Sequence, residues 1–413
     1  MTLVYLVAGE ASGDVLGARL MAALRARRPD LGFAGIGGPR MSAEGLASLF
    51  PMRELAVMGL VEVLPKLRSL RRRLVETADD IARRRPDIVV TIDSPGFALR
   101  LLRRIAPLGV PRVHYVAPQV WAWRESRARH FPGLWEKLLC LLPFEPEFFA
   151  RYDLPASFVG HPVLQSGADA GDAARFRARH KIAPTAPVVV LMPGSRRNEA
   201  PRLLPVFGRT LGRLQRRVPD LVPVVPVSAA VAATVDRAVA DWPVRAVIVT
   251  ELEDKHDAYA AAGAALTKSG TSTLELALAG VPMAVTYRVN PITALLARRL
   301  IRVPYVAMVN LLAGRALVPE LLQQDCDPAQ LADTLHALLT DPARAAAQRA
   351  GFAAALAQLR PPAGLPADAA AAEVLAMLGP AATDRAAAPA PIGQPGDRSM
   401  TPAGLDHGVK TRS

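Results

Sequence analysis

The stretch that decides the fold runs from Ala265 to Pro282 and reads ALTKSGTSTLELALAGVP. A short apolar run leads into Lys268 and a cluster of small polar residues, and a helix-like apolar pattern follows as far as Gly280. A continuous apolar run, a glycine turn and then a helical pattern are typical of a strand and helix in a parallel sheet. Backbone N–H groups and hydroxyls at such a helix start can also hold a phosphate.

The same unit recurs along the whole chain, because short apolar runs alternate with segments of helical period. Continuous runs of Val, Ile and Leu indicate strands that are buried on both faces, as in parallel sheets covered by helices. We therefore predict an α/β fold with two Rossmann-like, doubly wound domains that face each other across a cleft. The predicted strands span residues 2–9, 87–93, 112–118, 137–143, 157–162, 187–195, 221–228, 245–250, 264–270 and 282–287.

The length of 413 residues suits two domains better than one. A polar stretch rich in Gly, Ala and Asp separates the two series of strands, and an Ala/Pro/Gly-rich composition marks the end of the chain. The predicted units are a first domain at 1–163, a linker at 164–185, a second domain at 186–362, a terminal helix at 363–379 and a disordered tail at 380–413.

The net charge of +13 favours an anionic partner such as phospholipid or a phosphorylated metabolite. Nucleic acid is disfavoured, because no aromatic-rich basic signature is present. The two cysteines, Cys140 and Cys326, lack metal-ligand spacing and are predicted to be small core residues. No apolar run is long enough for a membrane-spanning helix, and the chain enters its first strand without a signal peptide.

Two turns of the first half carry candidate polar groups. In AGEASGD, the backbone around Gly9 and Gly13 could face an anion or a sugar, or Asp14 could simply cap a helix. In TIDSPGF, Asp93 ends an apolar strand and could serve as a general base or as a helix N-cap. The candidate acceptor or turn residues of the first segment are Gly9, Ser12, Gly13 and Asp14.

A third segment of the first half, HYVAPQVWAWR, is unusually aromatic for a chain with four tryptophans. Gln119 and Trp121 at the end of its strand could line a sugar or acyl site, whereas core packing would also explain the aromatic rings.

The second half offers donors and a cation that suit a nucleotide diphosphate. Gly194, Ser195 and Arg196 lie where a strand should end and combine backbone N–H groups with a guanidinium, although a surface arginine after a turn is the alternative. In the opening stretch, Gly270, Thr271 and Ser272 could hold phosphates and Glu275 could take two ribose hydroxyls. The alternative is Thr271 as N-cap with Glu275 as a favourable first-turn acid.

Residues 58–74, MGLVEVLPKLRSLRRRL, combine apolar and cationic side chains, as an interface with anionic lipid does. A helix docked on the sheet with a basic outer face would give the same pattern. The candidate membrane-facing residues are Val61, Val63, Leu64, Leu67 and Leu70, with Arg68, Arg71 and Arg72.

Taken in order, these segments resemble the lipid-A-disaccharide synthase family. The resemblance runs from residue 8 to about residue 323 and includes AGEASGD, IDSPGF, HYVAPQVWAWR, PGSR, SGTSTLE and NLLAGRALVPELLQ. It implies a GT-B glycosyltransferase that joins UDP-2,3-diacylglucosamine to 2,3-diacylglucosamine 1-phosphate, with inversion and without a metal or other cofactor. It also implies a peripheral place on the cytoplasmic face of the bacterial inner membrane, and it allows a homodimer.

The resemblance assigns roles to individual residues. It implies that Asp93 is the general base, that Arg196 neutralises the UDP diphosphate and that Glu275 binds the ribose. Residues 270–272 would then hold the phosphates, and Asn310 and Arg315, polar groups in an apolar segment, would shape the donor site.

Two other readings of the sequence stay open. Another GT-B enzyme that uses a UDP-sugar, such as a peptidoglycan-precursor transferase or a UDP-GlcNAc 2-epimerase, would share the architecture. A non-catalytic basic module would bind anionic membrane or nucleic acid without affinity for UDP.

Overall fold

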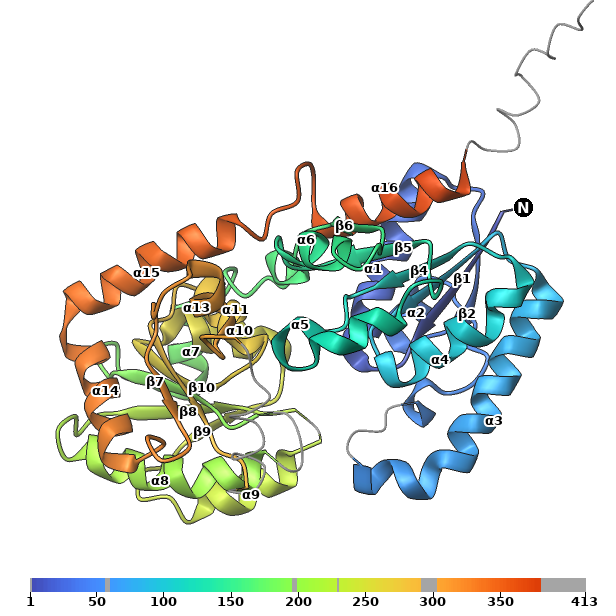
Figure 1. Ribbon diagram of the computed structural model, residues 1–413. Coiled ribbons are helices and arrows are strands. Elements are labelled where there is room, and N and C mark those ends of the chain that lie inside the picture. Colours follow the sequence, from blue (N-terminus) through green and yellow to red (C-terminus); the bar gives the residue numbers. More distant parts are fainter. Residues whose placement is uncertain (1, 56–59, 195–198, 229, 291–302, 380–413) are drawn as a thin grey trace, which may run out of the picture.

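The computed structural model describes residues 2–55, 60–194, 199–228, 230–290 and 303–379, without the side chains of 60–66. The described chain contains two parallel six-stranded sheets with helices packed against them (Figure 1), which confirms the predicted α/β class. The helices are α1 (Ala11–Arg27), α2 (Pro39–Ala43), α3 (Leu60–Arg84), α4 (Pro95–Ile105), α5 (Val120–Trp123), α6 (Glu145–Ala150), α7 (Ala173–His180), α8 (Ala200–Gln215), α9 (Ala232–Ala240), α10 (Leu252–Ala261), α11 (Ser272–Leu278), α13 (Met308–Ala313), α14 (Pro328–Thr340), α15 (Pro342–Ala357) and α16 (Pro366–Leu378).

The first sheet has the strand order β2-β1-β3-β4-β5-β6. The chain leaves β1 toward β2 and then returns to add β3 on the other side of β1, so the strand order reverses between β1 and β3. Ligands of open α/β sheets bind at such a switch point, outside the carboxyl ends of the strands. The strands are β1 (Leu3–Ala8), β2 (Gly32–Ile36), β3 (Ile88–Ile92), β4 (Arg112–Tyr115), β5 (Lys137–Cys140) and β6 (Ala156–Phe158).

The second sheet has the order β12-β11-β10-β7-β8-β9, and its switch point lies between β7 and β10. This is the arrangement of a dinucleotide-binding sheet, in which the first strand lies next to the fourth. The strands are β7 (Val188–Met192), β8 (Val222–Pro226), β9 (Val247–Val249), β10 (Ala264–Lys268), β11 (Met283–Tyr287) and β12 (Glu320–Leu322).

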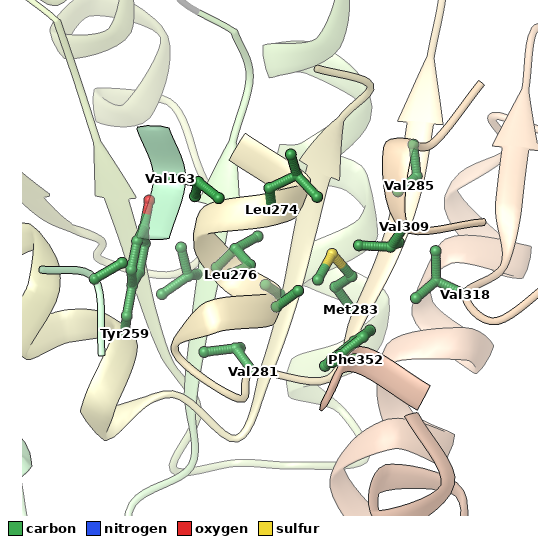
Figure 2. Packing of buried hydrophobic residues seen from close by; sticks show 14 of the residues in the cluster. Val163, Tyr259, Leu274, Leu276, Val281, Met283, Val285, Val309, Val318 and Phe352 are labelled. Atoms are coloured by element: carbon green, nitrogen blue, oxygen red, sulfur yellow. The ribbon is translucent and has the colours of Figure 1, made fainter. Parts of the chain in front are cut away.

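The core of the second half explains why the opening stretch folds as it does. Leu274 and Leu276 of α11 are fully buried and lie among Tyr259, Met283 and Phe352, which come from α10, β11 and α15 (Figure 2). Burying a leucine side chain contributes roughly 1.5–3 kcal/mol. The apolar face of this short helix therefore fixes α11 against the sheet, and its first turn stays at the carboxyl edge of β10.

Two segments connect the halves. Residues 164–185 contain α7, whose Phe176 is fully buried in the core of the second half and whose Arg175 pairs with Asp257 at 2.6 Å. Near the end of the described chain, α16 returns to the first half and lies along α1 (Figure 1). There Asp368 accepts a hydrogen bond from Arg27 at 2.7 Å. The domain boundaries themselves stay a prediction.

Candidate functional site

The switch point of the first sheet carries a strained turn. Asp93 and Ser94 follow β3 with φ angles of 52° and 47°, and the Asp93 N–H donates to the carbonyl of Tyr115 at 2.8 Å. Left-handed backbone is uncommon for residues other than glycine and clusters at functional sites. The turn thus places the partly exposed Asp93 at the carboxyl edge of the sheet, where the sequence predicted a polar group.

Gly9 makes this turn possible. A Cβ added at Gly9 would lie 2.3 Å from the Ser94 Oγ and 2.7 Å from its Cβ, which is far inside van der Waals contact. Only glycine lets the turn after β1 approach the turn after β3 this closely. The turn after β1 at Gly9 therefore lies directly against the turn that carries Asp93.

Asp14 and its neighbours have different surroundings. The Asp14 carboxylate is buried and accepts hydrogen bonds from the N–H groups of Gly38, Arg40 and Met41 at 2.8, 2.9 and 3.0 Å. These bonds hold the start of α2, so the carboxylate acts on a helix distant in sequence rather than on its own. Gly13 is buried in the first turn of α1, and Ser12 is exposed beside it.

The turn after β4 joins the two halves. Gln119 is exposed. The Trp121 ring packs against a buried cluster made mostly of second-half residues and against another that belongs to the first half, and it meets Phe144 edge-on with ring centroids 4.9 Å apart. Trp121 Nε1 donates to Glu145 Oε1 at 3.0 Å. Trp121 therefore serves the junction between the halves, which is compatible with the core-packing alternative as well as with a place beside the acceptor.

Glu145 is a residue that sequence reasoning missed. Its carboxylate is 2% exposed and also accepts the N–H groups of Leu141 and Leu142 at 3.0 Å each. Burial raises its pKa to about 7, although those hydrogen bonds favour the charged form. The only signal in the sequence is an acid that directly follows the strand-like run KLLCLLPF.

The raised pKa of Glu145 predicts a specific dependence of stability on pH. Because the folded form holds the proton more tightly, this group's contribution to stability is complete below about pH 4.5 and is lost as the pH rises to about 7. In Glu145→Gln that loss disappears, so the free energy of unfolding of the wild type relative to the variant should fall by about 3 kcal/mol across this window. Urea unfolding at several pH values measures it, and a constant difference between the two proteins would contradict it.

Two glycine turns form the switch point of the second sheet. Gly194 follows β7 with φ 106°, and Gly270 follows β10 with φ 150°, a region that side chains rarely adopt. A Cβ at Gly194 would also lie 2.7 Å from Glu199 Oε2. In the second turn Thr271 is exposed, and Ser272 Oγ lies 3.0 Å from Thr267 Oγ1. Ser195 and Arg196 lie outside the described residues.

Glu275 lies in the first turn of α11, where the sequence placed it. Its Oε2 accepts hydrogen bonds from Lys255 Nζ at 2.7 Å and from the Tyr259 hydroxyl at 3.3 Å, and its side chain is 23% exposed. Burial is the first cause that raises the pKa of Tyr259, and the Glu275 charge adds to it. Lys255 and Tyr259 were not predicted; they come from α10, and only the tertiary packing brings them to this acid.

Asn310 and Arg315 differ sharply in their surroundings. Asn310 is fully buried, exchanges two hydrogen bonds with the backbone of Val318 and donates to Glu320 Oε1 at 2.8 Å. Glu320 in turn accepts the Ala307 N–H at the start of α13. Asn310 thus shapes the loop between α13 and β12, whereas Arg315 is exposed.

The candidate membrane-facing helix, α3, divides into an outer and an inner side. Leu67 is 46% exposed, and Arg68, Arg71 and Arg72 are exposed around it. Leu70 instead packs, partly buried, against the core of the first half. The side chains of Val61, Val63 and Leu64 lie outside the described residues.

Arg73, the next residue of the same basic run, contacts other residues of the first half. It donates to both carboxylate oxygens of Glu54, at 2.7 and 2.8 Å, and its guanidinium lies 4.5 Å from the centre of the Phe50 ring.

Within the described chain, no helix is long and apolar enough to cross a membrane. Cys140 and Cys326 are both buried and free, which confirms their prediction as core residues.

Comparison with known proteins gives concordant results. A family model described as lipid-A-disaccharide synthetase matches residues 4–374. Lipid-A-disaccharide synthase of Gluconobacter oxydans (strain 621H) is 63% identical over 376 residues, which are 91% of this chain and 91% of that protein. The enzyme of the same name from Granulibacter bethesdensis (strain ATCC BAA-1260 / CGDNIH1) is 62% identical over 388 residues, covering 91% of this chain and 99% of its own.

Solved structures show the same architecture at low identity. UDP-GlcNAc 2-epimerase from Neisseria meningitidis, bound to UDP-GlcNAc, has a TM-score of 0.61 at 13% identity and covers 91% of this chain and 99% of its own. The calicheamicin glycosyltransferase CalG4 has a TM-score of 0.58 at 18% identity, with 92% and 99% covered. At this identity the likeness concerns the fold alone, which is GT-B.

Proposed function

The chain belongs to the lipid-A-disaccharide synthase family, and on that premise we propose that it condenses UDP-2,3-diacylglucosamine with 2,3-diacylglucosamine 1-phosphate. The products are a β-1,6-linked disaccharide 1-phosphate and UDP. Membership makes the protein a glycosyltransferase of lipid A biosynthesis. The two substrates, the inversion and the independence from metal are the proposal. The observation that supports it is the pair of switch points, each of which has polar residues at the carboxyl ends of its strands.

Asp93 is the proposed general base. The acceptor's 6-hydroxyl oxygen attacks the anomeric carbon of the donor, the bond from that carbon to the diphosphate breaks, and Asp93 takes the hydroxyl proton. UDP leaves with the electron pair of the broken bond. The left-handed turn and its packing on Gly9 support this role, because they hold the carboxylate at the sheet edge at a cost in backbone strain.

The second half is proposed to hold UDP. Gly194 and Gly270 let the backbone approach the diphosphate, Thr271 and Ser272 supply hydroxyls, and Arg196 adds charge. Glu275 would accept the ribose hydroxyls, with Lys255 and Tyr259 keeping its carboxylate in place. Fixed donors and cations of this kind stabilise the negative charge that develops on departing UDP.

The test is an assay with both defined substrates. Incubating the protein with UDP-2,3-diacylglucosamine and 2,3-diacylglucosamine 1-phosphate should yield the disaccharide 1-phosphate and UDP, detected by mass spectrometry, with and without a chelator. UDP should also raise the melting temperature. Absence of the disaccharide would sink the proposal, and an epimerised UDP-sugar would favour the alternative that shares this fold.

We further propose that the protein rests peripherally on the anionic cytoplasmic face of the inner membrane through the outer side of α3. Reversing the charges in Arg71→Glu/Arg72→Glu should weaken binding to phosphatidylglycerol vesicles by about tenfold or more, because each basic residue near such a surface contributes about 1 kcal/mol. Co-sedimentation measures the effect. Arg237→Glu/Arg245→Glu, at exposed positions of the second half, is the control with the same change in net charge. Equal loss in both variants would leave α3 without a special role.

A further inference from the structure

Lys268 lies between the two glycine turns of the second switch point. It is the last residue of β10, and a Cβ added at Gly194 would lie 3.4 Å from its Cδ. A Cβ added at Gly270 would lie 3.4 Å from its Cε. The lysine side chain therefore runs along both turns, next to the two glycines, which have no side chains. This is also the place at which a sheet of this topology binds its ligand.

An ion pair holds the end of this side chain. Lys268 Nζ lies 2.9 Å from Glu199 Oε1, and the two side chains are only 16% and 5% exposed. Glu199 immediately precedes α8, the helix that follows β7, so the pair joins the end of β10 to the start of that helix. Removing two charges from water is costly, and replacement by apolar residues is often neutral or stabilising. Stability alone therefore gives little reason to keep a charged pair here.

Among the described residues, the hydrogen bond to Glu199 leaves part of the donor capacity of the Lys268 ammonium group unused. A lysine carries three N–H donors, and the contact with Glu199 uses one of them. A diphosphate placed over the glycine turns offers several anionic oxygens within reach of the same nitrogen. Lysine is a common phosphate-binding residue that acts as a point charge, and it needs no fixed planar geometry.

We propose that Lys268 binds the diphosphate of the nucleotide sugar, and that Glu199 positions its ammonium group over the switch point. The inference rests on the proposed function and adds a residue to it. It gives this site a preference for a nucleoside diphosphate over the uncharged nucleoside. It also supplies a cation to the departing UDP from β10 itself, independently of the residues that follow Gly194.

Lys268→Met tests the proposal by comparing two probes, UDP and uridine. The variant should bind UDP about 10- to 100-fold more weakly, which is the effect of losing one hydrogen bond to a charged group. Its affinity for uridine should not change, because uridine carries no phosphate. Calorimetry for UDP and an NMR titration for uridine measure both, and Lys268→Arg should recover part of the UDP affinity.

A double variant guards against a simple folding defect. Lys268→Met leaves Glu199 buried without this partner, whereas Lys268→Met/Glu199→Gln removes both charges and should unfold near the wild-type temperature. Lys137→Met is the matched control, since this lysine is also half-buried and ion-paired, with Glu373, but lies in the first half. It should bind UDP like the wild type.

The outcomes separate the inference from the proposed function. Wild-type affinity for UDP in the double variant would overturn the role of Lys268 while leaving the donor site in place. A parallel loss of UDP and uridine binding would also overturn it, because the effect would then be structural. Failure of the wild-type protein itself to bind UDP would instead remove the proposed function.

Discussion

Asp93→Asn should lower turnover by about a thousandfold while it leaves the affinity for UDP nearly unchanged. Asparagine has the same shape but cannot take the proton of the acceptor hydroxyl, and a positioned general base contributes about 10²- to 10⁴-fold. Asparagine also tolerates left-handed backbone better than most residues, so the turn at φ 52° should survive the change. Steady-state rates of disaccharide formation and calorimetry with UDP measure the two effects.

The matched control lies at the other end of the same strand. Asp87 precedes β3, accepts the Leu3 N–H at 2.7 Å and is exposed at the amino edge of the sheet, away from the switch point. Asp87→Asn removes the same charge, likewise without a change of shape, and should keep full turnover. If Asp93→Asn lost UDP affinity as strongly as turnover, Asp93 would not be the base.

The strands and turns that carry the site could be predicted because their signals are local. The apolar runs before Gly9, Asp93, Gly194 and Gly270 are continuous, and each ends in a small or polar residue that marks the carboxyl end of a buried strand. What the sequence could not supply was strand order. The two switch points, which bring these four strand ends together in pairs, follow only from the pairing of β1 with β3 and of β7 with β10.

Elements whose stability comes from their neighbours were missed. The strand β2, GFAGI, has little strand propensity, and it forms because its backbone pairs with β1. The helix α7 was hidden in a stretch interpreted as a linker, because only Phe176 of its eight residues is buried. Glu145, Lys255 and Glu199 were missed for the same reason, since each is defined by a partner distant in sequence.

The second large effect is expected from a pair of changes at the first switch point. Gly9→Ala adds a Cβ that would lie 2.3 Å from Ser94 Oγ, so the turn that carries Asp93 must move. Overpacking of this kind costs about 1–3 kcal/mol, and a displacement of about 1 Å at a reacting group can cost about a hundredfold in rate. We therefore expect lower stability and about a hundredfold slower turnover in the single variant, measured by urea unfolding and by the disaccharide assay.

A second substitution, at Ser94, should restore the stability and turnover that Gly9→Ala removes. Ser94→Gly deletes both atoms that the new methyl group would meet, and glycine suits the φ of 47° at this position better than serine does. The backbone carbonyl of Ser94, which accepts the N–H groups of Phe97 and Ala98 at the start of α4, is unaffected. Gly9→Ala/Ser94→Gly should therefore regain most of the lost stability and turnover, a coupling of about 1–3 kcal/mol between the two sites. Additive losses in the double variant would mean that the contact between the two turns does not position Asp93.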